Sequence, residues 1–518
     1  MKFNRTKNAS RNIAAGLAQR LYQILVPFLM RTAMIYLLGV EYLGLDGLFT
    51  SILSVLNLAE LGVGSAMVYS MYKPVAEDDT VTICALMRLY KIYYRIIGLV
   101  VLAGGLIICP FVPKLISGSV PAGINVYVLF LLNLGATVLS YWLFAYKNCL
   151  FQAYQRADIV SKVTMAVNTL RYLIQFAILF VFHNYYLYLI VALASQAGIN
   201  IATAVAASKR FPALKPEGKL PKAVTSTINH RIRDLFTAKI GAVVVNSVDT
   251  LVISGFLGLT VLAIYQNYYF IITAITGILN IVMTSCMAGI GNSIITETKE
   301  KNFGDLKVFT FLIALMGCFC ASCLLGLFQP FMELWVGKDL MFGFPAVVCF
   351  GIYFFIMQIN TLLNMYKDAA GIWHEDRFRP LVTAAANLTL NLILVQVWGI
   401  YGVLLSTVLS MLFVGMPWLL RNLFTTLFSW NQVGAYLLKL VQYVAVSTAV
   451  CLLSCLLGQL VPLEGILLML VRGLICVGVT GGLFFLCFRR SPEFLRAVSL
   501  ADKITKGKFR LQQRLVKK

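Results

Sequence analysis

Six charged side chains stand inside long apolar segments of this sequence, and they are the residues best suited to do chemistry. They are Arg20, Arg31, Glu60, Arg171, Asp249 and Arg472. A charge at the centre of a lipid bilayer costs roughly 2.5–3.5 kcal/mol on insertion scales, so such residues persist mainly where helices enclose a polar pathway. Guanidinium groups can bind phosphate oxygens bidentately, and buried carboxylates can couple transport to an ion. The pattern therefore predicts a transport protein.

The composition predicts an all-α polytopic membrane protein. Of the 518 residues, 60% are hydrophobic and only 12% are charged, which is far from the profile of a soluble domain. A transmembrane helix needs about 20 apolar residues, and we predict about fourteen such helices between residues 12 and 488. The first of them is too long and too interrupted by charge to be a cleavable signal peptide.

Lysine and arginine are divided unequally between the predicted loops, and this division predicts the orientation. With the N-terminus inside, the external breaks contain only Lys114 and Lys338, while residues 208–234 and the tail after Phe488 are strongly basic. Because cytoplasmic loops carry the excess of positive charge, both termini should be cytoplasmic. This topology, together with attraction to anionic phospholipids, explains the formal net charge of +22 without a nucleic-acid partner.

The other reactive residue types predict neither a metal site nor an enzyme. Most of the 12 cysteines fall inside apolar segments and the 3 histidines are dispersed, so no disulfide framework and no metal-binding spacing is evident in the sequence. The predicted external loops are short and lack a convergent set of acids or histidines, and no phosphate-binding P-loop motif occurs. We expect no catalytic residues and no cofactor.

An internal repeat relates the two halves of the chain. The turn at residues 39–49 matches residues 255–265, and residues 154–168 match residues 373–387 at a similar offset. This offset, about 217 residues, equals six predicted helices. Because an even number of helices returns the chain to the same side of the membrane, the halves should be parallel repeats.

The repeat predicts the following domains: an N-terminal lobe at 1–207, a basic cytoplasmic linker at 208–234, a C-terminal lobe at 235–421, two further helices at 422–488, and a basic cytoplasmic tail at 489–518. Two six-helix lobes of this kind place their polar residues in a shared central cavity. Rocking of the lobes then opens the cavity to one side of the membrane or the other, which is an alternating-access design.

Polar stripes on the first helix of each predicted lobe should face this cavity. The stripe of the first predicted helix is Arg20, Gln23, Pro27 and Arg31. The stripe of the seventh is Lys239, Asn246 and Thr250, with Asp249 about 80° away on the helical wheel. Pro27 removes a backbone hydrogen bond, and it is either a hinge or a packing feature.

Each deep charge also has a structural interpretation. Arg171 could pair with Glu60 only to hold helices together, and Arg31 could extend to the membrane surface. Glu60 and Asp249 are candidates for ion coupling, although each could equally be the counter-ion of a neighbouring arginine. For Arg472 we favour a structural or lipid-facing role.

Three basic residues form a stripe at the cytoplasmic start of the third predicted helix: Arg88, Lys91 and Arg95. They form either the rim of a cytoplasmic vestibule or an anchor of the positive-inside type. We favour the anchor.

Three segments carry a family resemblance that covers about residues 1–488. They are the basic start from Lys2 to Arg11 followed by Asn12, the turn at residues 42–49, and the segment from Phe151 to Arg156. With a six-plus-six-plus-two arrangement of helices, they resemble the bacterial polysaccharide flippases. These are Wzx-type members of the multidrug/oligosaccharidyl-lipid/polysaccharide (MOP) exporter superfamily.

The resemblance implies a V-shaped pair of helical bundles in the bacterial plasma (inner) membrane that moves undecaprenyl-diphosphate-linked oligosaccharide from the inner to the outer leaflet. It also implies a cationic cavity that meets the diphosphate, for which Arg20, Arg31 and Arg171 are the candidates. The other candidate substrate-binding residues are Lys239, Gln23, Asn246 and Asn267. A polysaccharide polymerase is a candidate partner.

An ion-coupled multidrug or small-molecule exporter of the same superfamily is the alternative function. A cavity for organic cations should show an excess of carboxylates, whereas basic residues outnumber acids at the deep positions here. The related lipid II flippases usually carry Asp directly after the first deep Arg, but Leu21 follows Arg20 here, which favours another polysaccharide repeat unit. A negative cytoplasm itself favours outward movement of negative charge, so coupling to a proton or sodium gradient stays an open hypothesis.

Overall fold

The computed structural model describes residues 5–60, 62–118 and 120–504. Within these ranges the chain forms helices and turns and no strand, so the predicted all-α class is confirmed. Among the described residues, 11 helices are long and apolar enough to cross a membrane, or up to 12 if the bent pair Val126–Trp142 and Ala145–Ala153 is one span. The chain is therefore a multi-pass membrane protein, and the count of fourteen helices stays a prediction.

The helices group into two compact units, Met1–Gln266 and Asn267–Lys518. Unit 1 contains α1 (Arg5–Leu37), α2 (Val40–Leu56), η1 (Asn57–Glu60), α3 (Val63–Ala76), α4 (Thr80–Ile108), η2 (Cys109–Leu115), α5 (Val126–Trp142), η3 (Ala145–Lys147), α6 (Asn148–Ala153), α7 (Ala157–Phe182), α8 (Tyr185–Arg210), α9 (Lys222–Leu257) and the start of α10 (Leu259–Thr296). Unit 2 contains the rest of α10, α11 (Lys299–Val336), η4 (Lys338–Leu340), α12 (Phe344–Ala369), α13 (Arg379–Trp398), α14 (Ile400–Ser410), the π-helical turn η5 (Met411–Gly415), α15 (Met416–Thr426), η6 (Trp430–Gln432), α16 (Val433–Gln459), α17 (Gly465–Phe488) and α18 (Pro492–Ile504).

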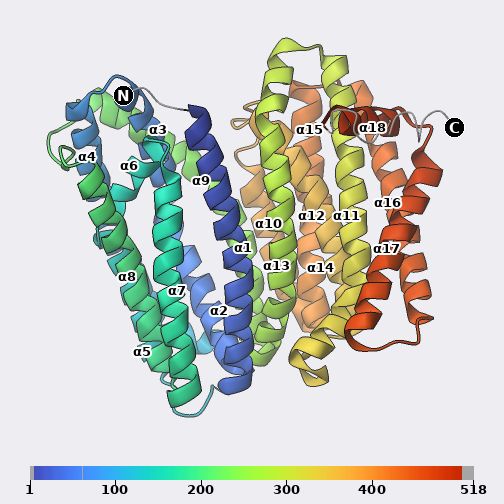
Figure 1. The fold of residues 1–518 in the computed structure, drawn as a ribbon, viewed down its shortest axis with the longest axis horizontal. Helices are drawn as coiled ribbons and strands as arrows, with labels where there is room; N and C mark the ends of the chain where they lie inside the picture. The colour runs from blue at the N-terminus through green and yellow to red at the C-terminus, as the bar shows by residue number, and fades with distance from the viewer. Residues whose placement is uncertain (1–4, 61, 119, 505–518) are drawn as a thin grey trace. The chain divides into compact units, whose positions relative to one another are not determined.

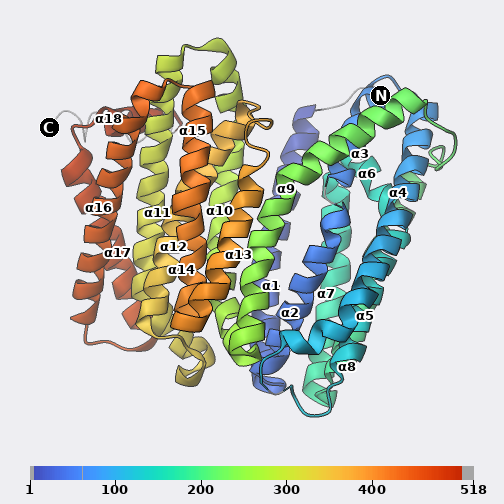
Figure 2. The same ribbon diagram turned by 180° about the vertical axis from the view of Figure 1, so that it is seen from behind.

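In unit 1, α7 lies between α1 and α8, and α4 packs against α5 (Figure 1). The long helix α9 runs obliquely over α3 and packs against α2 (Figure 2). Because α9 makes these contacts, unit 1 extends along the chain to Gln266, beyond residues 1–207 of the predicted N-terminal lobe.

Unit 2 is built around α11, which packs against α12, α16 and α17. Aromatic side chains fill its interior, and the ring of Phe311 packs against those of Tyr443, Phe484 and Phe488. The short helix α18 lies across the ends of these helices (Figure 1). Its Glu493, only 3% exposed, accepts a hydrogen bond of 3.2 Å from Nζ of Lys439, which ties α18 to α16.

Two glycines mark the same turn in each half of the chain. Gly39 precedes α2 with φ 120°, and Gly258 precedes α10 with φ 91°. Side chains rarely tolerate such positive angles, so glycine is required. The two residues are 219 positions apart, as are Tyr154 and Trp373. The counterpart of Gly39 is therefore Gly258 and not Gly255, so the predicted match of residues 39–49 with 255–265 is wrong by three positions.

The starts of α2 and α10 approach each other closely at two further glycines. A Cβ atom on Gly44 would lie 2.4 Å from the carbonyl oxygen of Leu259, and one on Gly47 would overlap the carboxamide of Gln266. Gly44 therefore has a packing reason, because a side chain there would meet the backbone of α10 and push the two helices apart. At Gly47 the flexible side chain of Gln266 would have to move aside.

Candidate functional site

Two of the deep arginines gather around one carboxylate in unit 1. Asp46, on α2, attracts both Arg31 of α1 and Arg171 of α7 electrostatically. All three side chains are half-buried. The guanidinium carbon of Arg171 also lies 4.1 Å from the ring centroid of Tyr172, which is a close cation–π contact. With two guanidinium groups and one carboxylate, this cluster keeps a net positive charge.

Tyrosines of α8 surround the same carboxylate. Tyr185 and Tyr188 stack with their ring centroids 5.9 Å apart, and Tyr42 contacts Tyr185 edge-on at 5.1 Å. Both α8 tyrosines interact electrostatically with Asp46. Asp46 was not predicted as a site residue. Its place between Leu45 and Gly47, inside an apolar segment, is nevertheless a sequence feature that marks it as a deep charge.

Glu60 occupies a separate tyrosine cage at the end of η1. Its Oε1 accepts a hydrogen bond of 2.7 Å from the hydroxyl of Tyr94, and its Oε2 accepts one of 2.9 Å from Tyr141. Tyr90 in turn donates to the hydroxyl oxygen of Tyr94 at 2.6 Å. In the described part of the chain, the carboxylate thus bonds to tyrosines and not to Arg171.

Two adjoining cavities lie inside unit 1, with volumes of about 560 Å³ and about 260 Å³. We call them together the chamber. They share Ala145, Arg171, Gln196 and Asn200 as lining residues. The larger cavity also reaches Glu60, and the smaller one reaches Asn168. The chamber therefore connects the guanidinium of Arg171 with the caged carboxylate of Glu60.

Carboxamide and hydroxyl groups dominate the chamber wall. The carboxamides are Asn57, Asn133, Asn148, Asn168, Gln196 and Asn200. Several polar atoms at this wall are buried and have no hydrogen-bond partner among the described residues: Oδ1 of Asn57, Asn148 and Asn168, Oγ1 of Thr203, and Nε of Arg171. Buried polar groups are normally bonded, so the chamber is chemically suited to water or to a polar ligand.

The other predicted residues of the first helix lie apart from the chamber. Arg20 is half-buried on α1 and Gln23 is exposed, and neither lines the two cavities. Between them, the hydroxyl groups of Tyr22 and Thr169 lie 3.0 Å apart, which joins α1 to α7.

Of the predicted site residues on α9 and α10, two have described side chains and two do not. Lys239 and Asn246 lie on α9, but their side chains are outside the described ones. Asp249 of α9 is 8% exposed and Asn267 of α10 is fully buried, in unit 1 and unit 2 respectively. The neighbouring Tyr268 stacks on Phe342 and Phe350, so this tyrosine belongs to the interior of unit 2.

Two of the three basic residues in the first half of α4 contact neighbouring parts of unit 1. The guanidinium of Arg88 donates to the carbonyl of Gly218 at 3.0 Å, and Nζ of Lys91 lies 5.8 Å from the ring centroid of Tyr146. Arg95 is exposed. Arg88 therefore fastens the linker between α8 and α9 to α4.

Arg472 bridges three helices of unit 2. Its Nε donates to the carbonyl of Gly458 at 3.0 Å, and a terminal nitrogen donates to the carbonyl of Gly326 at 3.3 Å. These bonds join α17 to α16 and α11, which is a structural use of the charge.

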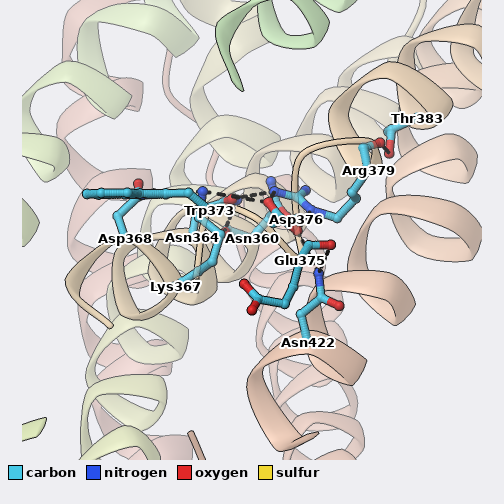
Figure 3. A network of polar contacts seen from close by, with 10 residues as sticks. All are labelled: Asn360, Asn364, Lys367, Asp368, Trp373, Glu375, Asp376, Arg379, Thr383 and Asn422. Atoms are coloured by element: carbon cyan, nitrogen blue, oxygen red, sulfur yellow. Dashed lines mark hydrogen bonds and ion pairs between the residues drawn. The ribbon is translucent and has the colours of Figure 1, made fainter. Parts of the chain in front are cut away.

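A buried ionic network lies at the start of α13 in unit 2 (Figure 3). Arg379 donates to Asp376 through Nε at 2.6 Å and through a terminal nitrogen at 2.7 Å, and that nitrogen also donates to Asn364. Lys367 and Asn422 complete the surroundings of Asp376 at 3.6 Å and 3.0 Å. The start of α7 in unit 1 has a comparable pair, in which Nε of Arg156 lies 2.9 Å from Asp158.

Further along α7 and α13, matched asparagines of the two halves differ in their hydrogen bonds. Asn387 of α13 donates to Thr407 at 3.0 Å and accepts from Asn391 at 3.3 Å, so its carboxamide is satisfied within unit 2. Asn168, its counterpart in the repeat, lines the chamber, and its Oδ1 has no hydrogen-bond partner among the described residues. The polar cavity is therefore not a general consequence of the repeat.

Among the described residues, no group of three or more His, Cys, Asp or Glu side chains is arranged to hold a metal ion.

No protein-family model matches the chain, and no curated protein matches it significantly. Solved structures do. The lipid II flippase MurJ in its inward closed conformation aligns with a TM-score of 0.66 and 13% identity, over 92% of this chain and 98% of MurJ. An inward-facing multidrug resistance MATE family transporter of the MOP superfamily aligns with a TM-score of 0.59 and 13% identity, over 78% of this chain and 97% of that chain. The Vibrio cholerae MATE transporter VcmN aligns with a TM-score of 0.53 and 15% identity, over 81% and 97%.

These similarities establish the fold. The chain has an all-α fold like that of MurJ and of the MATE transporters, and it covers nearly the whole length of MurJ. At 13–15% identity the likeness does not carry the cargo of either neighbour over to this chain.

Proposed function

We propose that the chain is an alternating-access flippase that moves undecaprenyl-diphosphate-linked oligosaccharide from the cytoplasmic to the outer leaflet of the bacterial plasma membrane, with both termini cytoplasmic. The structural likeness to a lipid II flippase supports the general mode of action. The chemistry of unit 1 supports the class of cargo.

The observation that carries the proposal is the arrangement of Arg31 and Arg171 around Asp46. A diphosphate loses much hydration when it enters a region of low dielectric, so it needs cationic hydrogen-bond donors that are already in place. Guanidinium groups match phosphate oxygens in geometry. Asp46 offsets only one of the two positive charges, which leaves the cluster able to attract an anion.

The sugar part of the cargo can be a polysaccharide repeat unit or the peptidoglycan precursor, since both share the undecaprenyl diphosphate. Leu21 directly after Arg20 favours the polysaccharide unit, because lipid II flippases usually carry Asp at this place. A polysaccharide polymerase then becomes the natural partner, and anionic phospholipids would surround the basic ends of the helices.

A small-molecule exporter is the second candidate, and two observations favour it. MATE family transporters share the fold, and Glu60 in its tyrosine cage offers a carboxylate beside the chamber. The same carboxylate, or the buried Asp249, would couple transport to a proton or sodium gradient in either function.

Leaflet-resolved transport in proteoliposomes tests the proposal. A fluorescent undecaprenyl-diphosphate oligosaccharide should change leaflet only when the protein is present. Arg31→Ala and Arg171→Ala should each slow this movement about tenfold or more, the value of one or two charge-assisted hydrogen bonds. Arg210→Ala is the matched control, because Arg210 is exposed at the end of α8.

Two results would contradict the proposal. If both variants move the lipid at the wild-type rate, the charged cluster does not bind the diphosphate. If the wild-type protein leaves the lipid in place but exports a small organic cation from the same vesicles, the chain is a small-molecule exporter.

A further inference from the structure

We propose that the chamber of unit 1 binds the uncharged, hydroxyl-bearing sugar next to the diphosphate. This inference rests on the proposed function, and it adds a glycan subsite that is distinct from the charged cluster. Arg171 is the junction of the two, because it lines both cavities and also interacts with Asp46.

The hydrogen-bonding groups of the wall indicate what kind of ligand fits. Oδ1 of Asn57, Asn148 and Asn168 and Oγ1 of Thr203 are buried without a partner among the described residues. These atoms are acceptors, and rotation of a carboxamide would offer a donor in the same place. A phosphate oxygen can only accept hydrogen bonds, whereas a sugar hydroxyl both donates and accepts. The wall therefore suits hydroxyl groups better than a second anion.

The charge of the wall also disfavours the diphosphate as occupant. Among the described residues that line the two cavities, Arg171 is the one basic residue and Glu60 the one acidic residue. A dianion would thus meet a single cation and an opposing carboxylate. The diphosphate gains more at the Arg31 side of Asp46, where a second guanidinium is present.

The two units differ at the positions of Asn168 and Thr164. In unit 2 the counterpart of Asn168 is Asn387, which bonds to Thr407 and Asn391, and the counterpart of Thr164 is Thr383, which donates to the carbonyl of Arg379 at 2.8 Å. At these matched positions, the side chains of unit 2 hydrogen-bond within the protein, whereas those of unit 1 line a cavity. A buried polar group without a hydrogen-bond partner lowers the stability of the fold unless water or a ligand binds it.

The size of the chamber agrees with a small glycan. Its larger cavity, about 560 Å³, falls within the range of roughly 300–1,000 Å³ that is typical of small-molecule pockets. The smaller cavity, about 260 Å³, holds Asn168 and Thr203 and adjoins the larger one at Arg171. A single sugar beside Arg171 would reach the open atoms of the smaller cavity.

The test compares undecaprenyl diphosphate carrying one N-acetylhexosamine with undecaprenyl diphosphate alone, whose terminal phosphate has one more ionisable oxygen. Because the same two lipids are used for every variant, this difference in charge cancels when the preferences of the variants are compared. Binding of each to the purified protein and leaflet-resolved movement of each in proteoliposomes are measured for wild type and for the double variant Asn168→Leu/Thr203→Val. Oδ1 of Asn168 and Oγ1 of Thr203 have no hydrogen-bond partner among the described residues, so their removal should leave the fold intact, and the thermal unfolding midpoint of the variant checks this. The matched control is Gln396→Leu, an exposed carboxamide of α13 that lies outside the chamber.

We expect the preference for the sugar-bearing lipid over the bare lipid, in binding and in movement, to fall about tenfold in the double variant and to stay unchanged in the control. An unchanged preference in a folded double variant would overturn the glycan subsite and leave the chamber to water. If wild type moves neither lipid, the proposed flippase function fails by itself. A sugar preference in binding that the double variant loses would then still support the subsite, whereas its absence would overturn both.

Discussion

Glu60 and Tyr141 are joined by a hydrogen bond of 2.9 Å from the tyrosine hydroxyl to Oε2 of the carboxylate, across 81 residues of sequence. With Tyr94 on the other oxygen, this bond lets a carboxylate stand inside the helical bundle without an ion pair among the described residues. Hydrogen bonds to charged groups contribute more than neutral ones, because the full charge strengthens the electrostatic attraction, and here they offset the hydration that the carboxylate loses on burial.

Tyr141→Phe should therefore destabilise the protein by about 1.5–3 kcal/mol, since one carboxylate oxygen loses its donor. The measurement is the denaturant midpoint in detergent. Tyr127→Phe in the same helix is the control, because Tyr127 is 45% exposed and its hydroxyl can bond to water. Equal midpoints for the two variants would show that Glu60 does not depend on Tyr141.

Arg31 and Asp46 should be energetically coupled. Arg31→Met and Asp46→Leu each remove one charge of a half-buried pair, and the double variant removes both, so its destabilisation should be smaller than the sum of the two by about 0.5–3 kcal/mol. A double-mutant cycle in unfolding free energy measures this difference. Strict additivity would show that the attraction between the two residues contributes nothing to the folded state.

Asp376→Asn should cost about 3–5 kcal/mol, because it leaves the buried guanidinium of Arg379 without its carboxylate. Lys367 keeps its closer ion pair with Asp368 at 2.7 Å. The comparison is Glu77→Gln, which breaks the pair between Lys73 and Glu77, whose side chains are 83% and 58% exposed. That change should stay within about 0.5 kcal/mol. A small effect of Asp376→Asn in the same unfolding measurement would mean that the network adds no stability.

The stability of the start of α4 should depend on pH through Asp79, which caps this helix. Hydrogen bonds from the hydroxyl and the backbone N–H of Thr82 hold the pKa of this carboxyl below its usual range. Since the folded pKa is the lower one, the carboxylate stabilises the fold above the unfolded value of about 3.9, and this contribution is lost as the pH falls through the folded pKa.

Asp79→Asn keeps the capping geometry but does not titrate. Between about pH 5 and pH 3, the amides at the start of α4 should therefore lose hydrogen-exchange protection more steeply in wild type than in this variant. Parallel losses in the two proteins would rule out the cap as the cause.

If Asp249 is the coupling carboxylate, Asp249→Asn should abolish the stimulation of transport by an imposed proton or sodium gradient, because a neutral amide cannot exchange charge with the coupling ion. If Asp249 only pairs with a basic neighbour, the stimulation should persist. Transport in proteoliposomes with and without each gradient measures this. Glu60→Gln is the companion variant, and the one that removes the stimulation identifies the coupling carboxylate. If both variants respond to the gradients like wild type, neither residue couples.

The sequence by itself determined the class of the protein. Apolar segments of bilayer length can only be helices there, because every backbone group must be bonded within the segment. The deep charges and the repeat of residues 154–168 in residues 373–387 were also evident from the sequence. Both are local properties of the chain, which is why they could be predicted.

The tertiary structure alone decided the partners of these charges. Glu60 and Arg171 both line the chamber, but Glu60 bonds to Tyr94 and Tyr141, while Asp46 faces Arg171. Asn168 and Asn387 occupy matched positions, and yet one faces a cavity and the other is bonded. The physical reason is that the rotation and packing of whole helices set which polar groups meet, and those depend on contacts between residues far apart in the chain.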